Sequence, residues 1–189
     1  MKTTSRTSDW SREIALLAMN SPSCAIGLMN GARDAIDAAT VRTIVAQLSE
    51  QMVSIDSQAR MLHLRLNVFE SRNLDRAMDQ PATIPVAKRC PLGPWCEVTV
   101  PLPVGATASW SLMQLPDWLP IWKESFDLLL VELGPLHLVA SRAIGRLCNR
   151  NFLILGPSGC GAPDWLMQQI SHHHQGGTII DGTIVGRAA

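Results

Sequence analysis

The sequence predicts an α/β fold in which a doubly wound, mostly parallel sheet carries helices on both faces. Short, continuous apolar runs recur along the chain, as expected for strands that are buried on both faces. Segments with apolar residues at helical spacing separate these runs, and such alternation requires right-handed crossovers between parallel strands. With 189 residues, of which 47% are apolar, the chain is long enough for one domain with a sizeable core.

The first third of the chain predicts a helix followed by half of a βαβ unit. Ser8 or Asp9 can cap the first helix, which is expected to end near Asn20. The next elements are a buried strand, a helix and a short second strand, at residues 24–29, 35–52 and 52–56. We therefore expect an N-terminal helix within residues 1–20, packed on a single α/β domain formed by residues 21–189.

The middle of the chain is open to two interpretations. Residues 59–69 fit either a helix or an amphipathic strand, and in the proline-dense segment 81–103 the best strand candidate is residues 97–100. The remainder is patterned clearly. Helices are predicted at residues 116–125, 136–147 and 163–174, and strands at residues 127–133, 151–155 and 178–185.

The balance of charge and hydropathy argues against several functions. The 16 basic and 16 acidic residues give a formal net charge of zero, so the chain lacks the positive field with which nucleic-acid-binding proteins attract phosphates. No run approaches the roughly 18 consecutive apolar residues of a membrane span, and residues 1–10 are too polar for a secretion signal. We expect a cytoplasmic protein that binds no nucleic acid, has no transmembrane segment and reaches the membrane, if at all, through a partner.

Several motifs that suggest binding or catalysis are incomplete. The glycine-rich turn at residues 156–161 looks like the Walker A loop of transport ATPases, but Ala162 and Pro163 replace the required lysine and hydroxyl. In residues 172–174, three successive histidines on a helix point about 100° apart, which predicts a solvated helix end rather than a metal site. The five cysteines are scattered, and no Gly-x-Ser-x-Gly nucleophile motif occurs. No metal site and no catalytic residue are therefore predicted.

A longer match lies in the C-terminal half. Residues 126–135, Phe-Asp-Leu-Leu-Leu-Val-Glu-Leu-Gly-Pro, resemble the Walker B segment of the bacterial tyrosine kinases of exopolysaccharide synthesis, which belong to the Min/Par-type P-loop ATPases. Residues 140–156 resemble the helix and strand that follow in this family, and residues 177–182 resemble its last strand. The resemblance spans about residues 21–186, implies a P-loop NTPase-like fold and places the phosphate loop after residues 24–29.

By this resemblance, the phosphate loop of the chain is vestigial. The family's loop is glycine-rich and ends in Gly-Lys-Thr or Gly-Lys-Ser, whereas the segment from Gly31 to Thr40 holds no lysine. Thr40 keeps the hydroxyl. Arg33 offers a positive charge but stands too early in the loop, and the carboxylate of Asp34 would repel phosphate.

Two acids complete the pocket that the resemblance implies. Asp56 corresponds to the acid on the second strand that helps to hold Mg²⁺ or water, and Glu132 replaces the Walker B aspartate with a longer side chain. Because the lysine is missing, we expect weak or no binding of ATP and Mg²⁺ and no bound cofactor. The chain also has no tyrosine, so it cannot carry the tyrosine cluster that these kinases phosphorylate on themselves.

The missing groups favour a non-catalytic relative of these kinases that acts as a binding or regulatory partner in exopolysaccharide synthesis or export. The alternatives are a nucleotide-binding ATPase with an unorthodox phosphate loop and an unrelated α/β enzyme or binding domain. For the first function we expect a protein partner or self-association. Trp118 and Trp122 are candidate interface residues, although core packing explains them equally well.

Overall fold

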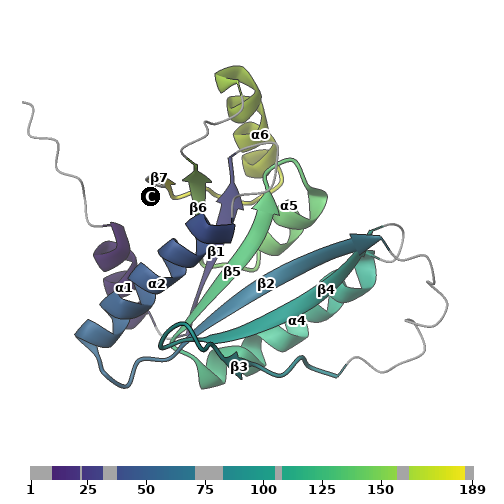
Figure 1. Ribbon diagram of the computed structural model, residues 1–189. Coiled ribbons are helices and arrows are strands. Elements are labelled where there is room, and N and C mark those ends of the chain that lie inside the picture. The colour runs from purple at the N-terminus through teal and green to yellow at the C-terminus, as the bar shows by residue number, and fades with distance from the viewer. Residues whose placement is uncertain are drawn as a thin grey trace, which may run out of the picture.

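The computed structural model describes residues 10–21, 23–31, 38–70, 83–104, 108–156 and 162–185 (Figure 1). The helices are α1 (Trp10–Asn20), α2 (Ala38–Ile55), α4 (Ala108–Ser125), α5 (Val139–Gly145) and α6 (Pro163–Gln175). The strands are β1 (Cys24–Asn30), β2 (Met61–Glu70), β3 (Lys88–Arg89), β4 (Cys96–Val104), β5 (Leu128–Pro135), β6 (Arg150–Leu155) and β7 (Gly182–Val185).

The strands form one seven-stranded sheet in the order β3-β4-β2-β5-β1-β6-β7, and every neighbouring pair is parallel except β3 and β4. This confirms the predicted doubly wound fold. Strands β1 and β5 lie side by side, yet the chain leaves β1 through α2 toward β2 and leaves β5 through α5 toward β6, in opposite directions (Figure 1). In open α/β sheets a ligand crevice forms outside the carboxyl ends of two such strands.

Two apolar clusters pack helices against opposite faces of the sheet. Alternate residues of β5 serve the two clusters: Leu128 and Leu130 pack with α1 and α2, whereas Leu129 and Val131 pack with α4 and α5. Helix α1 joins the first cluster through buried residues such as Ile14. Because both faces are covered, β1 and the first half of β5 are apolar runs rather than alternating patterns.

The prediction of a strand at residues 52–56 is wrong, because α2 continues through this segment. Met52 extends the buried stripe of Val45 and Leu48 at helical spacing, and this packing outweighs the β-branched content of the segment. The second strand in the chain is β2. Of the two interpretations of residues 59–69, the amphipathic strand is therefore correct.

Helix α4 begins at Ala108, well before the predicted start, and contains Pro116 and Pro120 in its interior. A proline normally marks the first turn of a helix, which is why the sequence suggested a later start. Tertiary packing of one helix face compensates for the backbone hydrogen bonds that the prolines remove. The buried face consists of Leu115, Trp118, Leu119 and Trp122. Within the described ranges, no helix is long and apolar enough to cross a membrane.

Strand β4 has an outer edge that β3 covers only beside its first two residues. The N–H of Cys90 donates to the carbonyl of Trp95, and Lys88 of β3 pairs with Glu97 of β4. Because backbone groups alternate in direction along a strand, the odd-numbered residues of β4 direct theirs to this outer edge. Pro101 and Pro103 occupy two of these positions, and proline has no N–H. Beyond β3, the outer edge of β4 therefore lacks a backbone donor at both positions.

Candidate functional site

The carboxyl ends of β1 and β5 meet at the centre of the sheet. Leu28 of β1 pairs with Glu132 of β5. Gly31 follows β1 directly and is buried, and its N–H donates to the carbonyl of Ile154 at 3.0 Å. A Cβ at Gly31 would lie 2.6 Å from a methyl group of Leu155 and 3.3 Å from the carbonyl oxygen of Ile154, so a side chain at this position would displace Leu155.

The predicted phosphate loop begins at Gly31 and ends in the first turn of α2, where Thr40 is half-buried. This strand, loop and helix order is the one that the sequence predicted. Arg33 and Asp34 lie outside the described residues. The structure therefore places Gly31 and Thr40 at the two ends of the predicted loop and leaves the charges between them undescribed.

Asp56 does not join this pocket. It is exposed just beyond the C-terminal end of α2, where its N–H donates to the carbonyl of Met52 and its carboxylate accepts from the N–H of Gln58. The chain enters β2 only at Met61, beside Leu128 at the start of β5. Asp56 thus lies at the amino end of the strands, and its assignment as a partner of Glu132 is wrong because the strand on which it was placed is helical.

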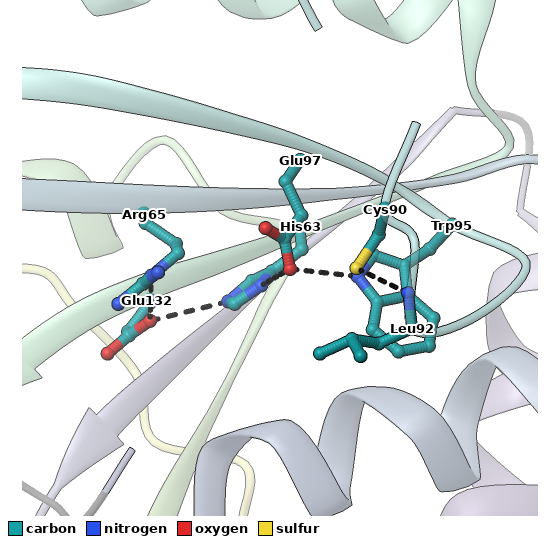
Figure 2. Close-up of polar contacts among 7 residues, drawn as sticks. All are labelled: His63, Arg65, Cys90, Leu92, Trp95, Glu97 and Glu132. Atoms are coloured by element: carbon teal, nitrogen blue, oxygen red, sulfur yellow. Dashed lines mark hydrogen bonds and ion pairs between the residues drawn. The ribbon is translucent and has the colours of Figure 1, made fainter. Parts of the chain in front are cut away.

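Glu132 instead takes part in a row of four charged or titratable side chains that crosses three strands, shown in Figure 2. We call it the polar row; it consists of Glu97 of β4, His63 and Arg65 of β2, and Glu132 of β5. His63 Nε2 lies 3.3 Å from Glu132 Oε2, and His63 Nδ1 lies 3.8 Å from Glu97 Oε1. Arg65 Nε lies 3.6 Å from Glu132 Oε2. The Glu132 carboxylate therefore faces two nitrogen-bearing side chains.

Burial differs along the polar row. His63 is 3% exposed, whereas Arg65, Glu97 and Glu132 each retain about a third or more of their exposure to solvent. The contact from His63 Nε2 to Glu132 does not have hydrogen-bond alignment, so within the described ranges this buried nitrogen has a nearby carboxylate but no hydrogen-bond partner. A buried polar atom of this kind is costly in a purely structural position and is typical of a site.

The pKa of Glu97 lies below its ordinary value. Partial burial alone would raise the pKa, but hydrogen bonds from the Trp95 indole, at 3.1 Å, and from the Cys90 thiol favour the carboxylate. The charge of His63, when this side chain is protonated, and that of Arg65 lower the pKa of Glu97 further. Glu97 is therefore a fixed negative charge at one end of the polar row, and Figure 2 shows Trp95 directed at it.

His63, Arg65 and Glu97 were not predicted as site residues. The signal was the alternation of His63 and Arg65 with the leucines of β2, which places both polar side chains on one face if residues 59–69 form a strand. The second part of the signal, the cross-strand pairing of His63 with Glu97 and of Arg65 with Glu132, depends on tertiary structure.

The described lysines do not replace the one missing from the loop. Lys88 lies on the edge strand β3. Lys123, near the end of α4, donates to Asn149 at 3.1 Å, and the N–H of Asn149 donates to Ala25 at the beginning of β1. Lys123 is thus at the amino end of β1, whereas a phosphate-binding lysine is needed at its carboxyl end.

Two further predictions are corrected by burial. The histidines at the end of α6 are not simply solvated, because His173 is completely buried. Trp118 and Trp122 are 9% and 5% exposed and lie in the apolar cluster beneath β2, β4 and β5, so they are core residues of this chain rather than interface residues. Across the part of the chain that the structure describes, no group of three His, Cys, Asp or Glu side chains is arranged to hold a metal ion.

The order of strand, loop and helix at the centre of a doubly wound parallel sheet, with an acid at the end of the adjacent strand, defines a P-loop NTPase-like fold. Comparison with known proteins shows which structures of this fold class the chain is similar to.

No protein-family model and no curated protein matches the chain. Solved structures do match it. The chain is similar to the BceF tyrosine kinase domain, with a TM-score of 0.61 and 20% identity over 92% of this chain and 73% of that chain. It is similar to the kinase domain of Escherichia coli tyrosine kinase ETK, with a TM-score of 0.63 and 15% identity over 93% and 73% of the two chains. The kinase domain of VpsO gives a TM-score of 0.58 and 11% identity over 95% and 97%. The chain thus has the fold of the bacterial tyrosine kinase domains, as the sequence motifs predicted.

Proposed function

We propose that the chain is a catalytically degenerate relative of the bacterial tyrosine kinase domains that acts as a binding or regulatory partner in exopolysaccharide synthesis or export. The observation that carries this proposal is that the Glu132 carboxylate lies close to the side chains of Arg65 and His63. By its sequence resemblance this carboxylate corresponds to the Walker B acid of the family, and it lies within 3.6 Å of Arg65 and 3.3 Å of His63. A guanidinium on the same oxygen opposes the approach of a divalent cation.

The placement of the lysines supports the same conclusion. A P-loop lysine neutralises the β- and γ-phosphates, and losing one such charge-assisted contact typically costs a few kcal/mol, on the order of a hundredfold in affinity. Lys88 and Lys123 lie at the edge of the sheet and at the amino end of β1. Neither can supply that charge from its position in the fold.

The first experiment is a calorimetric titration of the full chain with Mg·ATP and with Mg·ADP. We expect no saturable binding at micromolar concentrations. Micromolar affinity for either nucleotide would contradict the proposal and favour the ATPase with an unorthodox loop.

A gain-of-binding variant tests whether the pocket is a degenerate phosphate site. Ala39 precedes Thr40 and is exposed, so Ala39→Lys restores the Lys-Thr pair of the family's loop. We expect Ala39→Lys combined with Arg65→Ala to bind Mg·ATP about tenfold or more tighter than the parent. Gln47→Lys with Arg65→Ala is the control, because Gln47 is exposed two turns further along the same helix. Equal gains in both variants would show a non-specific charge effect.

The partner function needs a separate measurement. Affinity purification of the intact chain from its native cells, after mild cross-linking, is expected to recover proteins of polysaccharide synthesis or export. Recovery of none of these above a mock purification would contradict this part of the proposal, whatever the nucleotide titration shows.

A further inference from the structure

Helix α6 is anchored to the centre of the fold through one buried histidine. His173 lies near the C-terminal end of α6 and is fully buried. Its Nε2 is 2.7 Å from the carbonyl oxygen of Leu136, the residue that follows β5. The N–H of Leu136 in turn donates to the carbonyl of Asn30 at the end of β1. The histidine therefore ties α6 to the carboxyl ends of the two central strands.

The hydrogen bonding of His173 fixes its protonation state in the folded chain. A carbonyl only accepts, so Nε2 must carry the proton that it donates to Leu136. The other ring nitrogen, Nδ1, is buried and has no hydrogen-bond partner among the residues that the structure describes. A second proton on Nδ1 would create a buried donor with no acceptor among these residues and a buried charge, and both are unfavourable.

The charges that act on this ring are positive. Arg142 of α5 and the neighbouring residues His172 and His174 all oppose a positive charge on His173. Burial is the largest cause that lowers its pKa, and these charges add to it, whereas the hydrogen bond to Leu136 opposes the shift only in part. Arg146, at the end of α5, also approaches this helix end beside Gly176.

We propose that His173 is a pH-sensitive latch: when it binds a second proton, α6 separates from the β5–α5 connection while the rest of the sheet stays folded. The folded chain favours the neutral ring, so the latch is fully closed above the ordinary histidine pKa of about 6.5. The latch weakens as the pH falls below about 6.5 and continues to weaken until the pH has passed the lowered pKa of His173 in the folded chain. Opening would uncover the side of α6 that carries Leu166 and Ile170, which pack against the apolar cluster under α5.

Hydrogen exchange measured by mass spectrometry on the intact wild-type chain tests the latch. After correction for the intrinsic exchange rate, the protection of amides in α6 should fall by up to about tenfold per pH unit below about pH 6.5. Protection of α2, which packs on the other face of the sheet, should not change over the same range. Constant protection of α6 between pH 7.5 and pH 5, or an equal loss in α2 and α6, would overturn the proposal.

Matched histidine variants identify the group responsible. His173→Gln keeps an N–H donor for Leu136 but does not titrate, so its α6 protection should be independent of pH. His172→Gln removes the adjacent, partly exposed histidine and should keep the pH dependence of the parent. If His172→Gln abolishes the dependence and His173→Gln does not, the assignment to His173 is wrong. Should His173→Gln fail to fold, the wild-type profile still decides whether α6 opens on its own.

Discussion

The two faces of the sheet formed by β2, β4 and β5 differ sharply in composition although the same strands supply both. Among the side chains that the structure describes, the face under α4 is apolar, and Leu64 of β2, Val98 of β4 and Val131 of β5 share one cluster with Trp118 and Trp122 of that helix. The opposite face is apolar at the start of the strands, where α2 and the Trp95 turn cover it. Further along the strands, that face carries the polar row.

This difference separates residues that hold the fold together from residues available for function. Side chains under α4 are buried and have only packing partners, so their replacement should act on stability. The polar row combines a buried histidine with three partly exposed charges, an arrangement that contributes little to stability. Replacement of these side chains should therefore act less on stability than replacement of the residues under α4.

The largest expected effect is on the apolar face. Trp118→Ala and Trp122→Ala should each lower the free energy of unfolding by about 3–5 kcal/mol, because each removes a large side chain from a packed core. Denaturant unfolding measures this. Ile121→Ala is the control, since Ile121 is 50% exposed on the same helix and should change stability by no more than about 0.5 kcal/mol. Tryptophan variants that fold with parental stability would remove the distinction between the two faces.

An intermediate effect is expected at Glu97, where stability depends on pH. Because the folded state lowers the pKa of this carboxyl below its ordinary value of 4.5, its contribution is present above that pH and is lost as the pH falls through the folded-state pKa. Glu97→Gln should lower stability at pH 7 by about 1 kcal/mol or less, given its partial exposure, and should match the parent in strong acid. Parallel pH profiles for Glu97→Gln and the parent would contradict this, with exposed Glu50→Gln as the control.

A smaller effect is expected from Arg65→Ala. The Arg65–Glu132 ion pair is partly exposed, so its loss should cost about 0–1 kcal/mol in unfolding experiments. Leu64→Ala is the matched comparison, because the adjacent, fully buried leucine faces α4 and its truncation should cost about 2–5 kcal/mol. Equal losses for the two neighbours would show that the polar row is a structural core element.

The smallest expected effect is on the chemical reactivity of one thiol, that of Cys148, and involves no change in stability. Burial raises the pKa of Cys148 to about 12, although the Lys123 charge opposes the shift. Since the thiolate is the reactive form, Cys148 should react with iodoacetamide at pH 8 at least a hundredfold more slowly in the native chain than in the unfolded chain. Peptide-resolved mass spectrometry after timed alkylation measures this. Rapid native labelling of Cys148 would contradict the raised pKa of this thiol.

Continuous apolar runs, which mark strands buried on both faces, predicted the fold well. The strand at residues 24–29 and the Walker B-like strand at residues 127–133 both lie where the apolar runs indicated, because fully buried parallel strands give an unambiguous signal. The strand predicted at residues 52–56 failed, since a short β-branched segment continues the helical stripe of α2 as readily as it forms a strand. The start of α4 was missed because its two prolines mask a buried helix face.

Only those parts of the candidate site that depend on local sequence motifs could be predicted. Glu132 and the loop after β1 follow from local motifs, and the structure places Glu132 beside the end of β1. The assignment of Asp56 to the pocket was wrong because it depended on a strand at residues 52–56, where α2 continues instead. The partners that Glu132 actually has, His63 and Arg65, come from a strand distant in the sequence, and their register with Glu132 is set by sheet pairing rather than by any local pattern.

Pro101 and Pro103, on the edge of β4 beyond β3, bear on how molecules of this chain behave at high concentration. An edge strand without a neighbour is a template on which another chain can add a strand of its own, the first step toward fibrils and other insoluble deposits. A strand added at Pro101 and Pro103 would find no backbone N–H donor for two of its carbonyl groups, at about 1–3 kcal/mol for each unsatisfied group. Crowding many copies together should therefore favour contacts through side chains and discourage runaway growth of a shared sheet along this edge.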